Sequence, residues 1–413
     1  MALRKVMITG LGAASPYGVG VTALMRGLYA NRSAVVNLQP QWQPEVHDLS
    51  SWVGAPLSEP LDEQTIPRKF RRSMGRVAIL AHLASQEALQ QARVPESSFS
   101  AGRAGISFAS TMGSIGSVAQ FFAACFERRA VGGLPANIFL QFMSHTCAAN
   151  LAHVLGATGR VLSPNAACAS ALQAIGYGYE AVAYGQQDLM LCGGADELHV
   201  AAAASFDLVQ VASNHYNRQP QRTPRPFDRD RDGIVCGEGS GALILESEEA
   251  ARARGANILA EVVGFASTCD GTHMAQPRCA SIVACLRETL ERSALPPAAV
   301  GYVNAHATGT IQGDQAEAEA IGRIFGEGRV PVSSFKGHFG HTLGASGALE
   351  LIACVCMQRD GCLIPTRNLD QPGEGCAGID HVTALRRAKF DRFVKNSFAF
   401  GGINAAIVLQ RYG

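Results

Sequence analysis

The sequence predicts an α/β protein whose sheets are buried. Strand-like and helix-like segments alternate along the 413 residues, and this alternation is typical of chains in which helices cover a sheet. Only 17% of the residues are charged, 47% are hydrophobic and 44 are glycine, which argues against disorder and against a coiled coil. A chain of this length buries roughly three quarters of its unfolded surface, so its core needs no disulfide or metal.

The first part of the chain supplies strands and helices in alternation. A short apolar run closed by glycine predicts a strand over residues 5–10, and apolar residues at helical spacing predict a helix over 76–92. Apolar runs also predict buried strands over 104–111 and 188–195, with a helix over 170–185 between them. The remaining predictions here are a strand running into a helix over 239–255 and polar surface excursions over 38–65 and 213–233.

The second part repeats this style, so we expect two halves that meet near residue 250, although the sequence shows no strong residue-level repeat. The predicted elements are a strand over 258–268, a helix over 281–294, a strand and turn over 300–310, a helix over 315–326, a strand over 330–336, a helix over 346–359 and a closing apolar segment over 393–410.

Charge and cysteine usage limit the class of function. The net charge is +1, so no global basic excess points to nucleic acid, and a charged partner must bind a local patch. No stretch of 18 apolar residues predicts a membrane span, and the N-terminus is interpreted as the first strand rather than a signal peptide. The 12 cysteines are scattered in apolar runs and lack zinc-finger spacing, which indicates a reducing compartment and a cytoplasmic location.

Two motifs suggest ligands but fail on their details. ITGLGAAS (8–15) follows a strand, yet it lacks the third glycine and the later acidic residue of a dinucleotide site, so we interpret it as a tight strand-to-loop turn. DRDRDG (228–233) opens like a calcium loop with Asp228, Asp230 and Asp232. The twelfth position of such a loop, which must be glutamate, is Gly239 here, so calcium is not expected.

A cysteine and two histidines carry the strongest chemical signal. In NAACASA (165–171), a turn of small residues brings Cys168 to the start of a helix, where the helix dipole and free N–H groups favour thiolate. NAHATGT (304–310) places His306 at the end of an apolar strand, and a glycine-rich loop carries His338 and His341. Taken singly, each has an ordinary structural interpretation. Together they form the Cys/His set that thioester chemistry uses.

The same segments resemble the signatures of a known family. NAACASA, NAHATGT, KGHFGHTLGASGALE (336–350) and NSFAFGGIN (396–404), in that order, resemble the β-ketoacyl-[acyl-carrier-protein] synthases, in particular their elongating, two-histidine branch. The resemblance implies a thiolase-like fold in which two similar α/β halves form a five-layered α-β-α-β-α core. Residues 1–250 would carry the nucleophilic cysteine and cap insertions, and residues 251–413 the two catalytic histidines.

The resemblance also implies a reaction, the decarboxylative condensation of an acyl thioester with malonyl-acyl carrier protein. Cys168 would be the acylated nucleophile, while His306 and His341 would bind the malonyl thioester carbonyl and promote decarboxylation. No cofactor and no metal are implied, because the substrates ride on the phosphopantetheine of the carrier protein. The remaining implied roles are electrostatic organisation by Lys336, support by Glu350 from behind the site, phosphopantetheine binding by Thr308 and Thr310, and an oxyanion hole from the N–H groups of Cys168 and Phe400, with Phe400 also gating the acyl pocket.

Proteins with related activities have sequence features that this chain lacks. A thiolase needs a second catalytic cysteine near its C-terminus, where the last cysteine here is Cys376, and a starter-condensing synthase has asparagine in place of His341. A chain-length-factor-like subunit loses the nucleophile, whereas Cys168 is present. Fatty-acid synthesis and a secondary-metabolic polyketide or polyene pathway both stay open. So do a homodimer and a heterodimer with a chain-length-factor-like partner.

A basic cluster predicts where the carrier protein docks. At helical spacing, Arg68, Arg72 and Arg76 would stack on one face. Such a cluster is either a solvated helix face or, as the resemblance implies, a docking patch for an acidic acyl carrier protein. Nucleic acid is a poor fit because no aromatic residues interleave the charges. The predicted docking residues are Arg68, Lys69, Arg72, Arg76, Arg128 and Arg129, with Arg71 in the same run.

Overall fold

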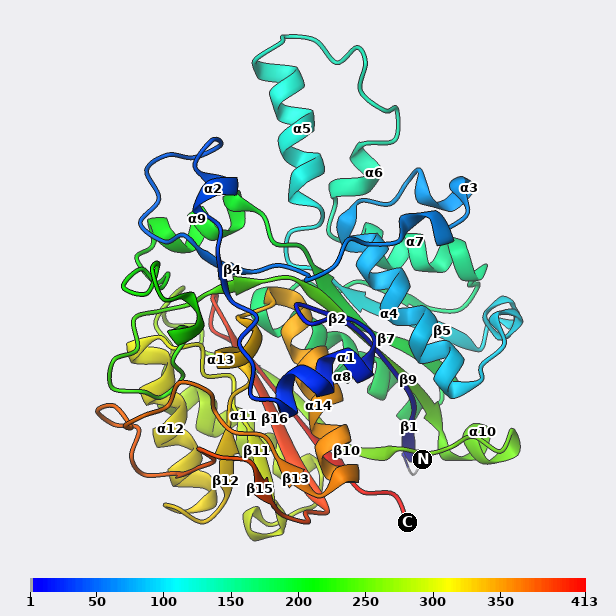
Figure 1. The fold of residues 1–413 in the computed structure, drawn as a ribbon. Coiled ribbons are helices and arrows are strands. Elements are labelled where there is room, and N and C mark those ends of the chain that lie inside the picture. Colours follow the sequence, from blue (N-terminus) through cyan, green and yellow to red (C-terminus); the bar gives the residue numbers. More distant parts are fainter. Residues whose placement is uncertain (1–2) are drawn as a thin grey trace.

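The computed structural model describes residues 3–413, and its main sheet is one bent sheet built from two halves of the same topology (Figure 1). In each half, three strands run parallel and the next two are antiparallel. The N-terminal half has the order β6 (Val161–Leu162), β5 (Ala104–Ala109), β7 (Leu189–Asp196), β9 (Gly239–Ser247) and β1 (Val6–Ser15). The C-terminal half has the order β12 (Pro331–Ser333), β11 (Tyr302–Asn304), β16 (Arg392–Ala399), β17 (Ile403–Gln410) and β10 (Ala260–Cys269), and it adds β14 (Asp380–His381) as a fourth parallel strand beside β12.

The halves meet where β1 pairs with β10, over only three residues of each strand. Two helices, α8 (Ser170–Ala183) and α14 (Ser346–Asp360), lie between the two half-sheets, and α14 is buried from Ser346 to Gln358 because both half-sheets cover it. The outer faces carry α4 (Arg76–Ala92) and α7 (Thr146–Leu155) on one side, and α11 (Cys279–Arg292) and α12 (Ile311–Phe325) on the other. This arrangement confirms the predicted α-β-α-β-α layers.

Most predicted elements are present, and the helix over 76–92 has the predicted bounds. The interpretation of residues 8–15 as a turn is wrong, because β1 continues to Ser15. Gly10 and Gly12 serve close packing of α4 on this strand. A Cβ atom would lie 2.2 Å from the Ala88 carbonyl oxygen at Gly10 and 1.9 Å from the Ala84 carbonyl oxygen at Gly12. These glycines therefore belong to a helix–sheet contact and not to a nucleotide loop.

The segment 213–233 is only partly the surface excursion that its polar sequence predicts. Thr223, Arg225, Phe227 and Asp228 are buried, and Arg225 forms a buried ion pair with Asp228 at 2.9 Å. Another excursion was not predicted: α5 (Ile115–Phe126) projects from the body, and α6 (Phe139–Phe142) returns to it (Figure 1).

Shorter elements complete the fold. Within residues 3–413, no helix combines the length and the apolar character needed to cross a bilayer. The elements are β2 (Gly18–Val19), α1 (Val21–Tyr29), β3 (Val36–Asn37), α2 (Gln39–Trp42), β4 (Val53–Ala55), α3 (Arg68–Arg71), α9 (Val200–Leu208), β8 (Cys236–Gly237), α10 (Glu248–Ala253), α13 (Lys336–Phe339), β13 (Cys362–Leu363), β14 (Asp380–His381) and β15 (Arg386–Arg387).

Candidate active site

Cys168 lies in a tight bend immediately before α8. Ala167 has a left-handed backbone with φ of 46°, and Ser170 locks the bend: its hydroxyl accepts from the Ala166 N–H at 2.9 Å and donates to the Ala167 carbonyl at 2.6 Å. Burial raises the pKa of the Cys168 thiol to about 12, although the ammonium group of Lys336 opposes this rise. Desolvation therefore opposes the thiolate that the helix start was expected to favour.

Two histidines face this cysteine across a buried pocket. His306 follows β11, and His341 follows α13 in the loop that leads into α14. The ligand atoms of Cys168, His306 and His341 lie within 4.8 Å of one another, and the two imidazole rings meet edge to face with centroids 5.4 Å apart. The third histidine singled out from the sequence, His338, is fully buried and does not belong to this group.

Both imidazoles of the pocket are neutral. Burial holds the pKa values of His306 and His341 well below the usual range, and the positive charge of Lys336 lowers both further. Nδ1 of His341 lies 2.8 Å from the Ser346 hydroxyl, while its Nε2 has no hydrogen-bond partner among residues 3–413. Because a hydroxyl can donate or accept, Ser346 supports either neutral tautomer of His341.

Two acidic residues of α12 hold the turn that carries His306. Glu317 accepts from the backbone N–H groups of His306 and Ala307 at 2.8 and 2.7 Å. Asp314 accepts from the N–H groups of Thr308 and Gly309, and burial raises its pKa to about 7. Neither carboxylate was predicted from the sequence. Their spacing of three residues on the helix after the histidine turn is the signal that could have found them.

A buried cluster of charges lies behind the histidines. The carboxylate of Glu350 on α14 bridges two ammonium groups, Lys336 at 2.7 Å and Lys395 at 2.6 Å, and all three side chains are fully buried. Lys336 and Glu350 were singled out from the sequence, but Lys395 was not. A lysine in the centre of the apolar strand β16 was the available signal, because lysine is almost never fully buried without a partner.

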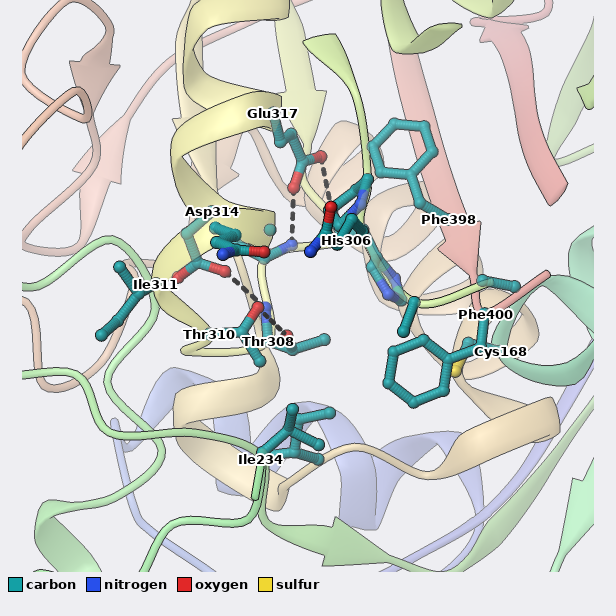
Figure 2. A pocket seen from close by; sticks show the side chains of 18 of the residues that line it. Cys168, Ile234, His306, Thr308, Thr310, Ile311, Asp314, Glu317, Phe398 and Phe400 are labelled. Carbon is teal, nitrogen blue, oxygen red and sulfur yellow. Dashed lines mark hydrogen bonds between the residues drawn. The ribbon is translucent and has the colours of Figure 1, made fainter. Parts of the chain in front are cut away.

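The pocket in front of this cluster is a cavity of about 340 Å³ that opens to the surface. Cys168, His306 and His341 line it together with Thr308 and Thr310, whose hydroxyl oxygens lie 3.2 Å apart, and with Phe400 in the turn between β16 and β17. Figure 2 shows the Phe400 ring beside the sulfur of Cys168, with the two threonines on the far side of the pocket. All the residues implied for catalysis and for phosphopantetheine therefore lie at this cavity or directly behind it.

Comparison with known proteins identifies the family. Residues 3–251 match the N-terminal domain model of the β-ketoacyl synthases, and residues 259–370 match the C-terminal domain model. The chain belongs to the β-ketoacyl synthase family. It is 35% identical over 426 residues to 3-oxoacyl-[acyl-carrier-protein] synthase 2 of Vibrio cholerae, with all of both chains covered. This membership confirms the resemblance and makes the protein a condensing enzyme of the acyltransferase class.

Solved structures agree with this family. A β-ketoacyl synthase from Burkholderia phymatum superposes with a TM-score of 0.95 at 40% identity, and the ishigamide ketosynthase/chain length factor with a TM-score of 0.92 at 29% identity. In both comparisons the whole of each chain is covered. The fold is therefore that of the ketosynthases.

The cysteine and histidines of the synthase are also ligand types that a thiophilic cation such as Zn²⁺ prefers. The low pKa values of the imidazoles would leave their nitrogen lone pairs free. However, the ammonium group of Lys336 is close enough to lower both histidine pKa values, so it opposes a divalent cation at the same point. The donor set fits a metal by residue type but not by charge.

The basic cluster of the synthase differs from its prediction. Arg68, Arg72 and Arg76 do not share one helix, because α3 ends at Arg71 and Gly75 precedes a separate helix, α4. Arg76 is not free for docking either, because its guanidinium binds both carboxylate oxygens of Glu238, at 2.7 and 2.8 Å. Arg68, Lys69 and Arg72 are exposed on or beside α3, while Arg128 and Arg129 are exposed just beyond the outer end of the α5 projection (Figure 1).

Proposed function

We propose that this synthase forms 3-oxoacyl thioesters by joining an acyl group held on Cys168 to the two-carbon unit of malonyl-acyl carrier protein. The observation that supports this most directly is the convergence of one thiol and two neutral imidazoles within 4.8 Å in a cavity open to the surface. The curated relative from Vibrio cholerae is named for the same activity.

In the first half-reaction, the Cys168 sulfur attacks the carbonyl carbon of the acyl thioester. The carbon–sulfur bond to the carrier breaks, and the proton of the Cys168 thiol ends on the departing carrier thiol. Because the resting thiol is protonated, a base must take this proton as the bond forms, and either neutral imidazole of the pocket, His306 or His341, can do so, so that acylation survives the loss of one of them. The N–H groups of Cys168 and Phe400 hold the developing oxyanion, and such a donor typically contributes about 10²–10³ in rate.

In the second half-reaction, malonyl thioester enters the same pocket and loses CO₂. The electrons of the broken C–C bond form an enolate, whose oxygen needs two donors. Nε2–H groups of neutral His306 and His341 supply them, since Ser346 also supports the tautomer with the His341 proton on Nε2. The enolate carbon attacks the acyl carbonyl on Cys168, the bond to sulfur breaks, and the thiolate takes one proton from water, the proton that decarboxylative condensation consumes overall. Lys336 would favour the negative charge throughout, and Thr308 and Thr310 would bind the phosphopantetheine.

The test is mass spectrometry of the intact protein after incubation with a panel of acyl-acyl carrier proteins. The expected result is one acyl group on Cys168, no acyl group on Cys168→Ala, and 3-oxoacyl product only when malonyl-acyl carrier protein is added. Cys269→Ala is the matched control, because Cys269 is an exposed thiol of the same chain. Acylation that persists in Cys168→Ala, or condensation without Cys168, would exclude the proposal.

Carrier docking is assigned to Arg68, Lys69 and Arg72, because these side chains are exposed and form no ion pair within residues 3–413. Attraction between exposed charges chiefly speeds encounter and is screened over about 8 Å at physiological salt. Arg68→Glu with Lys69→Glu should therefore raise KM for carrier-bound substrate at low salt and leave turnover of a pantetheine thioester unchanged. The control is the same reversal at exposed Arg387 and Lys389. An equal loss of activity with the carrier-bound substrate and with the pantetheine thioester would mean that the cluster is only a solvated face.

We assign the projection formed by α5 and α6 as the surface that binds a partner chain. Phe126 is 72% exposed and stacks on exposed Phe122 with ring centroids 5.5 Å apart, and exposed Phe139 lies on α6. A row of exposed aromatic rings is typical of an interface, so we infer a dimer with a second copy of the chain. Light scattering should give a dimer for the parent, a monomer for Phe126→Asp, and a dimer for the control Leu208→Asp, a change at an 83% exposed residue. A parent monomer that dimerises only with a co-expressed chain-length-factor-like subunit would favour the heterodimer.

A further inference from the structure

One wall of the pocket carries a buried carboxylate that the mechanism above does not use. Asp232 lines the same cavity as Cys168, Thr308 and Thr310, and its side chain is only 5% exposed. Its Oδ2 atom accepts from the backbone N–H groups of Asn214 and His215, both at 2.9 Å. Its Oδ1 atom is buried and has no hydrogen-bond partner among residues 3–413. A buried acceptor without a partner is costly, so it indicates a missing donor.

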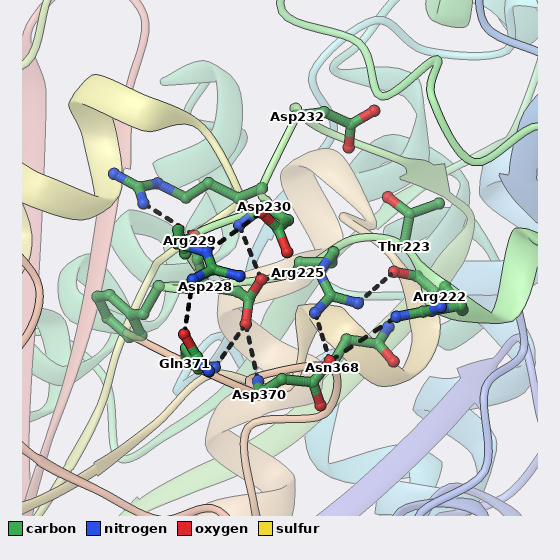
Figure 3. Close-up of polar contacts among 12 residues, drawn as sticks. Arg222, Thr223, Arg225, Asp228, Arg229, Asp230, Asp232, Asn368, Asp370 and Gln371 are labelled. Atoms are coloured by element: carbon green, nitrogen blue, oxygen red, sulfur yellow. Dashed lines mark hydrogen bonds and ion pairs between the residues drawn. The ribbon is translucent and has the colours of Figure 1, made fainter. Parts of the chain in front are cut away.

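The surrounding charges do not supply that donor. Figure 3 shows Arg225, Asp228, Asp230 and Asp370 joined in one network of polar contacts, with Asp232 apart from it. The nearest cationic candidate, His215, lies 4.0 Å away from the occupied Oδ2 atom and is itself exposed. The donor to Oδ1 must therefore come from whatever enters the cavity.

Asp232 is held firmly beside the loop that carries the threonines. The adjoining Gly233 has φ of 136°, and a Cβ atom there would lie 2.2 Å from the Val211 carbonyl oxygen, so only glycine fits at this position. The preceding residue, Arg231, donates to the backbone carbonyls of Thr310 and Ile311 at 3.3 and 2.9 Å. These contacts tie the wall that bears Asp232 to the loop that bears Thr308 and Thr310.

The geometry fits an amide-containing chain that passes along this part of the cavity wall. A carboxylate oxygen only accepts, so it selects a hydrogen-bond donor such as an amide N–H group. The phosphopantetheine arm is such a chain, with two amide groups that each offer one N–H donor. We propose that Asp232 is a positioning residue whose Oδ1 atom accepts a hydrogen bond from an amide N–H of the phosphopantetheine arm. This inference rests on the proposed function, because it takes the cavity to be the path of that arm.

The test combines a conservative variant with altered substrates. Asp232→Asn preserves the size of the side chain, and its amide oxygen can still accept from Asn214 and His215, but it turns an NH₂ group toward the cavity. The substrates are acyl-pantetheine and two analogues in which one or the other amide N–H is replaced by an ester oxygen. Asp230→Asn is the matched control, because it makes the same charge change on an exposed side chain two residues away.

The expected result is specific to one amide. In the parent, one of the two ester analogues should lose about ten-fold to a hundred-fold in kcat/KM for Cys168 acylation, the usual worth of a hydrogen bond to a charged group. In Asp232→Asn the true substrate should lose a similar factor, and that ester replacement should cost nothing further. Asp230→Asn should behave as the parent.

Several results would overturn the inference. Equal losses from the ester replacement in parent and Asp232→Asn would mean that the carboxylate only supports the wall. If the variant does not fold, the parent enzyme alone still tests the inference. Unchanged kcat/KM with both ester analogues would show that Oδ1 accepts no hydrogen bond from either amide. Failure of the proposed function would look different: the parent would then accept no acyl group on Cys168 from any pantetheine thioester.

Discussion

Glu350→Gln tests the charge cluster behind the histidines. In the parent, one carboxylate neutralises part of the charge of Lys336 and Lys395, from 2.7 and 2.6 Å, in a region without solvent. The variant leaves two buried ammonium groups with no counter-charge between them. Removing one partner of a buried ion pair costs about 3–5 kcal/mol. We therefore expect the free energy of unfolding at pH 7 to fall by that amount.

The size of this loss has a ceiling that depends on pH. The folded variant can escape the repulsion by releasing one lysine proton, which costs about 1.4 kcal/mol for each pH unit below the ordinary lysine pKa of about 10.4. That ceiling is about 5 kcal/mol at pH 7 and about 2 kcal/mol at pH 9. Burial already lowers the pKa of Lys336 in the parent, and Glu350 opposes that shift, so the variant releases the proton at still lower pH. The unfolded chain then holds more protons than the folded variant, and stability rises with pH.

Urea unfolding followed by circular dichroism at pH 7, 8 and 9 measures both effects. The control is Glu319→Gln, whose carboxylate pairs with Arg323 on the surface of α12, and there the loss should be about 0.5 kcal/mol at every pH. A loss below about 1 kcal/mol for Glu350→Gln at pH 7, or a loss that does not shrink by pH 9, would refute the reasoning. In that case the two ammonium groups would not both be charged in the parent.

Three further predictions follow from the site and the core. His306→Ala and His341→Ala should each still bind an acyl group on Cys168 but release CO₂ about 10²–10³-fold more slowly in single-turnover assays, and normal CO₂ release in both would contradict the division of roles. Burial raises the pKa of Asp314 from 3.8 to about 7, so the folded chain holds one more proton than the unfolded chain between these values, and this group lowers stability as pH rises from about 4 to 7. Asp314→Asn should flatten that slope by up to about 1.4 kcal/mol per pH unit in unfolding titrations, and an unchanged slope would contradict this assignment. Gly12→Ala should destabilise the chain by about 1–3 kcal/mol in thermal unfolding, whereas Gly132→Ala, where a Cβ atom meets nothing within 4 Å, should change stability little.

The sequence predicted those parts of the site that lie in short contiguous motifs. Cys168, His306 and His341 each stand in a turn of small residues, because substrate and backbone donors must approach them closely, and that requirement leaves a local signature. Glu317 and Lys395 leave a weaker one. Their roles depend on which helix packs on which turn, and the printed sequence does not give that proximity.

The basic cluster shows the same limit from the other side. Helical spacing alone placed Arg68, Arg72 and Arg76 on one face, but Gly75 separates two helices. Moreover, Arg76 pairs with Glu238, which lies 162 residues away in the chain. A local pattern can predict that charges are exposed, but only the fold shows which of them already has a partner.

The charge of Lys336 also influences the resting protonation states of the cysteine and the two histidines. In a thiolate–imidazolium pair, the thiol pKa is low and the imidazole is protonated. Here burial raises the pKa of Cys168 to about 12, while burial and Lys336 hold the pKa values of His306 and His341 far below neutrality. The ammonium group of Lys336 therefore favours thiolate but disfavours imidazolium, so it does not stabilise the ion pair as a unit. A resting thiol beside neutral imidazoles suits a reaction in which both histidines must donate N–H bonds to an enolate, because neutral donors can stabilise that charge without giving up a proton.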